Sequence, residues 1–157
     1  MEVGIFAAGC FWGVQAVFDQ VKGVINTTVG YTGGHVKNPS YEDVCNKNTG
    51  HTEAVRIEFD GKKVSYEKLV EIFFMNHDPT TMNRHGPDVG EQYRSAIFYV
   101  NDKQKKLAEK VMKEYQKKLK KKIVTEITKA GEFYVAEDYH QKYYKTHNIT
   151  CHVKLAI

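Results

Sequence analysis

The sequence predicts an α/β fold, an α+β sandwich built around a mixed sheet and contained in one domain. Short apolar or alternating segments typical of strands are interleaved with segments whose apolar residues recur every three or four positions, the period of a helix. Elements that alternate in this way pack as helices against a sheet. The 157 residues are enough for a hydrophobic core without disulfide support, and they contain no internal repeat or low-complexity linker.

The first strand and the first helix are predicted on either side of a Gly-Cys pair. Residues 3–8 form a short apolar run that suits a buried strand. After this run, apolar side chains spaced three or four residues apart predict a helix, at Phe11, Val14, Val17, Phe18 and Val21. Cys10 therefore stands at the predicted junction between strand and helix.

Two further strands are predicted in the first half of the chain. Residues 24–31 are rich in β-branched side chains and end at glycines. Residues 52–59 alternate, so that Val55, Ile57 and Phe59 share one face. The segment between the two strands contains proline, glycine and asparagine without periodicity, which is typical of a functional loop.

A second helix and a second loop are predicted next. Ser65 is a suitable N-cap for a helix that should end near His77, because Pro79 disfavours helix in the residue before it. A loop up to Gly90 follows this helix. Residues 95–100 then have the composition of another buried strand.

The last part of the chain is predicted to contain the longest helix. Asn101 and Gln104 resemble a capping box that opens it. Residues 123–128 predict a final strand, and residues 137–144 are compatible with a short helix. The remaining tail is expected to be irregular.

Charge is concentrated on this longest helix. The formal net charge is +4, and ten lysines lie between residues 102 and 122. Such a segment can bind nucleic acid or an acidic partner through non-specific electrostatics. Leu107, Val111, Tyr115 and Leu119 recur every four residues, which is the pattern of an amphipathic helix with a solvated outer face. We favour this second interpretation and expect no nucleic-acid partner, because the sequence carries no known nucleic-acid motif.

The cysteines, histidines and apolar segments limit the class of protein. Cys10, Cys45 and Cys151 form neither a zinc spacing nor an even-numbered disulfide framework, which favours a reducing compartment. We find no signal-sequence pattern and no long apolar span, so we expect a soluble cytoplasmic protein without a membrane partner. The seven histidines form no pair with metal-site spacing and a partner carboxylate, so we expect no metal.

Cys10 carries the clearest chemical signal. At the start of a helix, unpaired backbone N–H groups and the positive end of the helix dipole favour the thiolate, which is the nucleophilic form. Gly9 and Gly13 allow a substrate to approach the sulfur, and Phe11 and Trp12 supply apolar surface for a small apolar group. The alternative is a buried structural cysteine, which position alone favours.

The pentapeptide Gly9-Cys10-Phe11-Trp12-Gly13 resembles the active-site signature of the A-class peptide methionine sulfoxide reductases. Other segments resemble blocks of that family, in the family's order: Gly30-Tyr31-Thr32-Gly33-Gly34, Asn38-Pro39-Ser40-Tyr41, Gly50-His51-Thr52-Glu53-Ala54-Val55, Asn76-His77-Asp78-Pro79, Gln92-Tyr93-Arg94-Ser95-Ala96-Ile97 and Ala136-Glu137-Asp138. The resemblance implies a ferredoxin-like plait with a mixed sheet and additional helices and loops. It implies one catalytic domain over residues 1–157, in which we expect residues 144–157 to be a mobile tail.

The resemblance also implies a role for each residue at the site. Cys10 would attack the sulfoxide sulfur and become a sulfenic acid. Glu53 would be the general acid, because a carboxyl group among apolar groups has a raised pKa and holds a proton at neutral pH. Tyr41 and Tyr93 would bind the sulfoxide oxygen. The remaining implied members are Asp88, which would support this oxygen-binding cage, and Phe11 and Trp12, which would pack on the substrate methyl group.

The implied activity is thiol-dependent reduction of methionine S-sulfoxide, free or in proteins, as a repair of oxidative damage with no bound cofactor. Many family members resolve the sulfenic acid with a cysteine in a glycine-rich tail. Cys151 stands at about that place, although its neighbours include no glycine. We expect a disulfide between Cys10 and Cys151 that thioredoxin or another thiol reduces. A cycle with an external thiol alone stays open, as does the role of Cys45.

The residues alone, without the resemblance, also allow functions of other classes. A redox-responsive binding protein would use Cys10 as a sensor thiol and the lysine-rich helix as a partner contact. A thiol hydrolase would need a histidine base, and no histidine can be assigned to the sulfur from the sequence. Catalytic turnover of methionine sulfoxide separates the enzyme from the binding protein. We expect a monomer.

Overall fold

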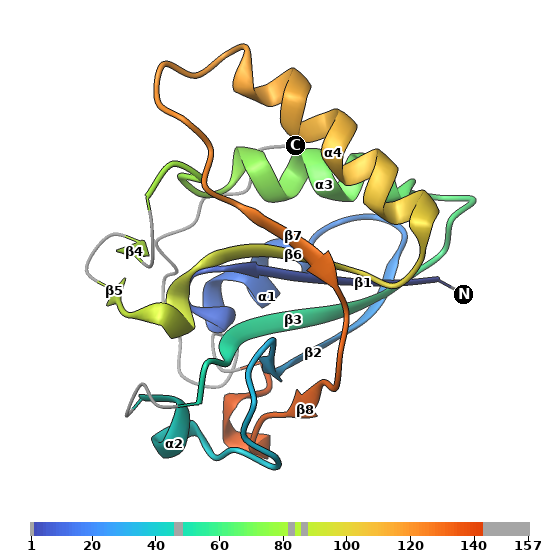
Figure 1. The fold of residues 1–157 in the computed structure, drawn as a ribbon. Helices are drawn as coiled ribbons and strands as arrows, with labels where there is room; N and C mark the ends of the chain where they lie inside the picture. Colours follow the sequence, from blue (N-terminus) through green and yellow to red (C-terminus); the bar gives the residue numbers. More distant parts are fainter. Residues whose placement is uncertain (1, 46–48, 82–83, 86–87, 143–157) are drawn as a thin grey trace.

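The computed structural model describes residues 2–45, 49–81, 84–85 and 88–142. The elements in chain order are β1 (Glu2–Ala8), α1 (Phe11–Asp19), β2 (Val24–Thr32), α2 (Tyr41–Cys45), β3 (Thr52–Phe59), α3 (Tyr66–Met75), β4 (Arg84–His85), β5 (Asp88–Val89), the 3-10 turn η1 (Glu91–Tyr93), β6 (Ser95–Tyr99), α4 (Asp102–Gln116), β7 (Glu126–Lys129), β8 (Tyr134–Val135) and the 3-10 turn η2 (Asp138–His140). Figure 1 shows α3 and α4 side by side over the sheet.

Six of the strands form one mixed sheet, in the order β7-β6-β1-β3-β2-β8. Neighbouring strands are antiparallel, except that β6 and β7 are parallel. A parallel pair needs a crossover connection, and α4 provides it. The short strands β4 and β5 form a separate hairpin. The predicted α/β architecture with a mixed sheet is confirmed.

The two faces of the sheet differ in what covers them. One face packs on α1, α3 and α4 in the main core, and Val55, Ile57 and Phe59 of β3 are completely buried there, as the alternation predicts. The opposite face carries a smaller cluster formed by Ile5, Ala7, Ala54, Ala96 and Phe98. The helices α1, α3 and α4 therefore form one layer and the sheet forms the other.

The predicted helix starts are confirmed by side-chain caps. The Ser65 hydroxyl accepts a hydrogen bond from the Lys68 amide at 3.0 Å. Asn101 Oδ1 accepts one from the Gln104 amide at 2.9 Å. The Gln104 side chain reaches back one residue further than in a capping box, because its Oε1 accepts from the Val100 amide at 3.0 Å.

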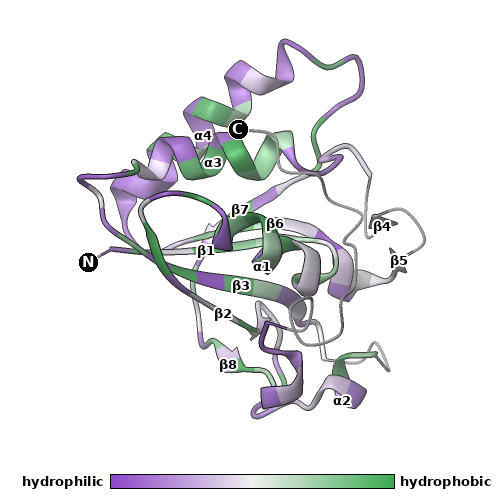
Figure 2. Cartoon of the chain, turned by 180° about the vertical axis from the view of Figure 1, so that it is seen from behind, coloured by the Kyte–Doolittle hydropathy of each residue, from purple (hydrophilic) through white to green (hydrophobic). Residues whose placement is uncertain are grey.

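The lysine-rich helix α4 is amphipathic, as predicted, but it ends at Gln116, so Leu119 of the predicted apolar face lies beyond it. Ala108 and Val111 are buried, whereas all lysines within α4 are exposed. Figure 2 shows α4 mostly hydrophilic, with hydrophobic residues interspersed along it. Across the described ranges, no helix combines the length and apolar character needed to cross a membrane.

Two predicted boundaries differ from the structure. The last long strand begins at Glu126 rather than Ile123, because the Val124 amide donates to the Pro79 carbonyl at 2.8 Å instead of joining the sheet. The short helix expected over residues 137–144 is confirmed only as the 3-10 helix η2, and residues 143–144 lie outside the described residues. Only the short turn η2 forms there, because Gln141 takes an extended backbone and its side chain bonds to both backbone groups of Val29.

Candidate active site

Cys10 is the N-cap of α1, just beyond the carboxyl end of β1. Gly9 has a φ of 93°, a left-handed value that favours glycine, and it turns the chain out of the strand. The Cys10 carbonyl accepts hydrogen bonds from the amides of Gly13 and Val14 at 3.2 and 3.3 Å. The thiol is not in a disulfide, and Cys10 is partly exposed. A partly exposed cysteine at the positive end of a helix dipole differs from a buried structural cysteine.

Glu53 lies beside this cysteine, as the second residue of β3. Its Oε1 accepts a hydrogen bond from the Phe11 amide at 3.2 Å. That amide is one of the N–H groups that have no partner within the helix. Glu53 is 1% exposed, so the solvated glutamate that the spacing alone favours is excluded. The sheet thus places a carboxyl group, shielded from water, next to Cys10.

The two predicted tyrosines reach the site from different segments. Tyr41 opens α2, and Tyr93 ends η1. Burial, a hydrogen bond with Cys45 and the charges of Glu53 and Tyr93 raise the pKa of Tyr41 above its ordinary value. The Thr52 hydroxyl donates to the carbonyl of the residue before Tyr93 at 2.9 Å, which ties η1 to the strand of Glu53. Tyr41 and Glu53 therefore lie within electrostatic range of each other.

Other predicted residues are only partly placed. Asp88 belongs to β5, where its backbone pairs with His85 of β4. The side chain of Asp88 is outside the described parts of the chain, and so are Cys151 and the predicted mobile tail. Cys45 is partly exposed at the end of α2. Burial raises the pKa of the Cys45 thiol more than its hydrogen bond with Tyr41 lowers it.

Aromatic residues of the site gather around His140, which the sequence analysis did not select. Trp12 Nε1 donates a hydrogen bond to His140 Nδ1 at 3.1 Å. The ring centroids of Phe11, Trp12 and Tyr41 lie 5.3, 5.6 and 4.4 Å from the imidazole centroid. His140 itself is 2% exposed. The predicted apolar pair Phe11 and Trp12 therefore belongs to a larger aromatic cluster.

The hydrogen bond from Trp12 fixes the protonation of His140. An indole nitrogen can only donate, so Nδ1 must accept and the neutral ring carries its proton on Nε2. Burial lowers the pKa of His140, against the opposing effect of the Glu137 charge. The Nε2 atom is buried and has no hydrogen-bond partner among the described residues. The cluster thus contains a buried N–H group that is available to an acceptor.

Glu137 is the second residue that the sequence analysis did not assign to the site. Its Oε1 accepts from the Tyr31 hydroxyl at 3.0 Å, and its Oε2 accepts from the Tyr41 amide at 3.1 Å. The segment Ala136-Glu137-Asp138 resembles a family block, so the block was visible in the sequence. Glu137 and His140 contact residues 96 to 128 positions away, so no local pattern in the sequence could reveal these contacts.

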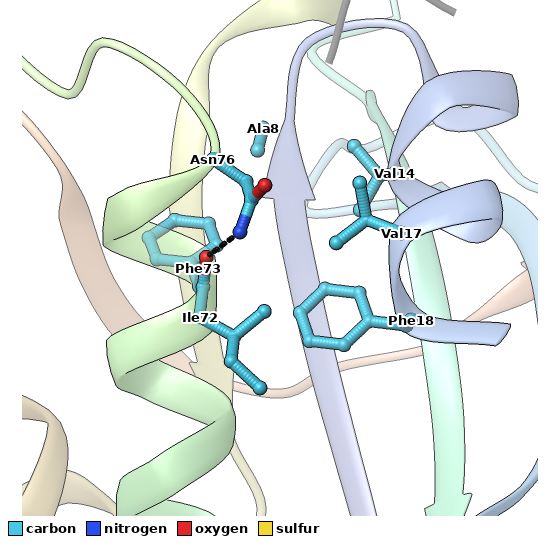
Figure 3. A pocket seen from close by; sticks show the side chains of 7 residues that line it. All are labelled: Ala8, Val14, Val17, Phe18, Ile72, Phe73 and Asn76. Atoms are coloured by element: carbon cyan, nitrogen blue, oxygen red, sulfur yellow. Dashed lines mark hydrogen bonds between the residues drawn. The ribbon is translucent and has the colours of Figure 1, made fainter. Parts of the chain in front are cut away.

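A small cavity lies between α1 and α3, away from these residues. Its lining is apolar apart from Asn76, and it consists of Ala8, Val14, Val17, Phe18, Ile72, Phe73 and Asn76. Figure 3 shows these side chains and the hydrogen bond from Asn76 Nδ2 to the Ile72 carbonyl, at 2.8 Å. None of the predicted site residues lines it. We therefore assign this cavity to helix packing.

The geometry defines a class of protein. A thiol at a helix start, a buried carboxyl group beside it and nearby hydroxyl and aromatic groups form the site of a thiol-dependent enzyme. Among the described residues, no group of three or more histidine, cysteine or acidic residues is placed to hold a metal ion. A family model described as peptide methionine sulfoxide reductase matches residues 2–157. The chain belongs to this family and is an oxidoreductase that reduces methionine sulfoxide.

Individual relatives agree with the family model. The chain is 56% identical over 147 residues to a peptide methionine sulfoxide reductase of Methanosarcina acetivorans, covering 92% of this chain and 78% of the relative. The crystal structure of reduced Mxr1 from Saccharomyces cerevisiae matches with a TM-score of 0.94 and 33% identity, covering 99% of this chain and 92% of the other. The structure of Mxr1 in complex with Trx2 matches with a TM-score of 0.67 and 25% identity, covering 99% and 90%. These similarities favour the enzyme over a redox-responsive binding protein.

Proposed function

We propose that the chain reduces the S epimer of methionine sulfoxide, free or in oxidised proteins, and so repairs oxidative damage. The 3.2 Å hydrogen bond between the Phe11 amide and Glu53 Oε1 carries this proposal, because it holds a buried proton donor beside the Cys10 thiol. The preference for the S epimer rests on the resemblance to the A class of the family.

In the proposed reaction, the Cys10 thiolate attacks the sulfoxide sulfur while Glu53 protonates the sulfoxide oxygen. The substrate sulfur–oxygen bond breaks and the oxygen passes to the Cys10 sulfur, so methionine leaves and a sulfenic acid remains. The substrate sulfur is reduced by two electrons and the Cys10 sulfur is oxidised by two. Burial disfavours the charged form of a carboxyl group, which suits Glu53 for holding a proton at neutral pH.

The hydroxyl groups of Tyr41 and Tyr93 are proposed to donate hydrogen bonds to the sulfoxide oxygen as negative charge develops there. Burial and the neighbouring charges raise the pKa of Tyr41, so this hydroxyl keeps the proton that it must donate. Asp88 is proposed to support the two tyrosines through a hydrogen-bond network. Its place in β5, close in sequence to η1, supports that assignment.

Phe11 and Trp12 are proposed to pack on the methyl group of the substrate. Their position directly after Cys10 and their contacts with His140 and Tyr41 support a preformed apolar surface beside the reacting sulfur. The buried Nε2–H of His140 offers a hydrogen bond to a polar group of a bound substrate. No bound cofactor is needed for these steps.

The sulfenic acid is proposed to be resolved by Cys151. Lys142, the last described residue, is attached to α1, because its amide donates to Gln15 Oε1 at 2.8 Å and its Nζ lies 2.6 Å from Asp19 Oδ1. The nine residues from there to Cys151 span up to about 30 Å when extended. That length suffices to reach Cys10, which lies about 8 to 14 Å further along the same helix.

A thioredoxin-like dithiol, or another thiol, is proposed to reduce the resulting disulfide between Cys10 and Cys151. The solved complex of Mxr1 with Trx2, a relative of similar fold, supports a partner of this kind. We further propose that the protein acts as a cytoplasmic monomer without nucleic-acid or membrane partners. Exposed lysines on the outer face of α4 suit a solvated helix.

The ferredoxin-like plait is proposed for the central part of the fold. The elements β1-α1-β2-β3-α3-β6 follow the β-α-β-β-α-β order, and their strands lie in the spatial order β6-β1-β3-β2. The remaining strands would then be additions at the two edges of the sheet.

The proposal is tested by assaying the protein with separate S- and R-sulfoxides of methionine and a thiol reductant. We expect turnover of the S form only, in the free amino acid and in an oxidised peptide. The Cys10→Ser variant should fold and lose turnover, because a hydroxyl is a far poorer nucleophile. Comparable activity of that variant, or equal activity on both epimers, would contradict the proposal.

A further inference from the structure

Glu137, the residue directly before the turn η2, bonds to two segments that are far from it in the sequence. Oε1 accepts from the hydroxyl of Tyr31, which belongs to β2, at 3.0 Å. Oε2 accepts from the amide of Tyr41, the first residue of α2, at 3.1 Å. One half-buried carboxylate therefore bonds to a sheet strand with one oxygen and to a short helix with the other.

This carboxylate is held in its ionised form. Burial acts to raise the pKa of Glu137, but hydrogen bonds from its own amide, the Tyr41 amide and the Tyr31 hydroxyl outweigh burial and lower the pKa. The charge in turn contributes to the raised pKa of Tyr31, which therefore stays a neutral donor. Hydrogen bonds to a charged acceptor are stronger than neutral ones. The contact is thus a firm link between the strand and the helix.

Tyr41 depends on such a link because α2 is too short to hold its own position. The helix has five residues, and isolated helices of that length are not stable in water. Ser40 and Asp43 cap the helix reciprocally at 3.0 and 3.1 Å, but these bonds lie within the segment itself. Val44 is buried in the core on one side. At the start of the helix, the bond to Glu137 joins Tyr41 to the rest of the site.

The other end of the link is rigid and lies close to the proposed acid. Tyr31 is completely buried in β2 and is the cross-strand partner of Glu53 in β3. Its ring centroid is 5.7 Å from that of Phe11. Glu137 therefore bonds the start of α2 to the pair of strands, β2 and β3, that places Glu53 next to Cys10.

We propose that Glu137 is a positioning residue for Tyr41, fixing the tyrosine relative to Glu53 so that its hydroxyl meets the sulfoxide oxygen. This inference rests on the proposed function, in which Tyr41 donates to that oxygen. Glu137 acts through its hydrogen bonds with Tyr31 and Tyr41 and does not touch the substrate. A displaced donor stabilises the transition state poorly, so the loss of Glu137 should slow the reductive step.

A double-mutant cycle tests this role, with the single-turnover rate of methionine formation as the measurement. Glu137→Ala should lower the rate about tenfold in the parent, because Tyr41 is no longer held in place. The same change in a Tyr41→Phe background should cost less than about twofold, since the hydroxyl that Glu137 positions is already missing. In a Tyr93→Phe background the cost should again be about tenfold.

Conservative variants of Glu137 distinguish the effect of its hydrogen bonds on the rate from the effect of its charge. Glu137→Gln should keep a rate close to the parent, because the amide oxygen can accept from Tyr41 and the amide nitrogen can donate to Tyr31. Glu137→Asp keeps the charge but is one methylene too short to reach both partners. This variant should lower the rate about threefold, again only where the Tyr41 hydroxyl is present. It replaces Glu137→Ala in the cycle if that variant does not fold. Asp138→Ala, a change at the exposed neighbouring carboxylate, is the matched control and should leave the rate unchanged.

Equal losses in the Tyr41→Phe and Tyr93→Phe backgrounds would show that Glu137 does not act through Tyr41, and the inference would then be wrong. An unchanged rate in folded Glu137→Ala would overturn it as well. Absence of sulfoxide reduction by the parent protein would instead contradict the proposed function, so the two failures are distinguishable.

Discussion

The single tryptophan of the chain donates a hydrogen bond to a buried histidine: Trp12 Nε1 lies 3.1 Å from His140 Nδ1, and the two residues are 128 positions apart. The bond joins the first turn of α1 to η2 at the end of the described chain. It also keeps His140 neutral, because a proton on Nδ1 would remove the acceptor that the indole needs.

This relationship predicts how stability depends on pH. Burial lowers the pKa of His140 below its ordinary value of 6.5, so the unfolded chain binds a proton that the folded chain does not. The contribution is present above the unfolded pKa and is lost as the pH falls toward the folded pKa. We expect the free energy of unfolding, measured with urea and tryptophan fluorescence, to fall below about pH 6.5.

His140→Phe is the variant that isolates this effect. It should flatten the pH dependence below pH 6.5 and lower the free energy of unfolding at neutral pH by about 1–3 kcal/mol, because the indole N–H loses its acceptor. His35→Phe, the same change at an exposed histidine, serves as the control. An unaltered pH profile in His140→Phe would show that another group is responsible.

Glu53 gives the second prediction, which concerns the proton donor. Glu53→Gln should lower the single-turnover rate about 10²-fold at neutral pH, because the buried amide still accepts from Phe11 but has no proton of suitable acidity to give. Tyr41→Phe or Tyr93→Phe alone should cost less, about tenfold, since the other members of the cage remain. If Glu53→Gln reacted at the parent rate, the acid would have to be another group.

Some residues of this site could be predicted from the sequence, and others could not. Cys10 could be selected as a candidate nucleophile from its place between a strand pattern and a helix pattern. The role of Glu53 came from the family resemblance, because spacing alone favours a solvated or salt-bridged glutamate. Periodicity also predicted the sheet, its buried face on β3 and the caps of α3 and α4. Tyr41 and Tyr93 came from the family resemblance alone, since nothing in their local patterns separates them from packing tyrosines.

Other features could not be predicted because they depend on contacts between distant segments. His140 and Glu137 bond to partners 96 to 128 residues away, which local patterns do not encode. The short elements α2, β4, β5 and η1 lie in segments without periodicity, where tertiary contacts decide the backbone. The predicted helix after Glu137 is shortened to η2 for the same reason, because Gln141 bonds to the backbone of Val29 instead of continuing a helix.

The third prediction concerns the loop that leads from β2 toward Tyr41. Gly34 packs so closely on the His51 amide and the Thr49 carbonyl that a Cβ atom would overlap both backbone groups. Its amide also donates to His51 Nδ1 at 3.0 Å. Gly34→Ala should therefore lower the free energy of unfolding by about 2 kcal/mol and reduce activity, because backbone atoms cannot move aside as a flexible side chain can.

Gly131→Ala is the matched control, because a Cβ atom there would meet nothing within 4 Å. It should change the free energy of unfolding by less than about 0.5 kcal/mol. Urea unfolding of both variants provides the comparison. Similar stabilities for the two alanine variants would show that the loop relaxes without cost.

The fourth prediction concerns how oxidised Cys10 is recycled. The chain is attached to α1 at Lys142, and the nine residues from there to Cys151 are long enough to extend to Cys10. Cys45 is less suited to attack, since burial raises the pKa of its thiol and keeps it protonated.

We expect that one equivalent of methionine sulfoxide, added without reductant, removes two free thiols, and that peptide mapping finds them linked as Cys10 and Cys151. In Cys151→Ser only one thiol should be lost, as a sulfenic acid that dimedone traps, whereas Cys45→Ser should behave like the parent. Loss of a single thiol in the parent would show that an external thiol resolves the sulfenic acid, and a link to Cys45 would show that α2 supplies the second thiol.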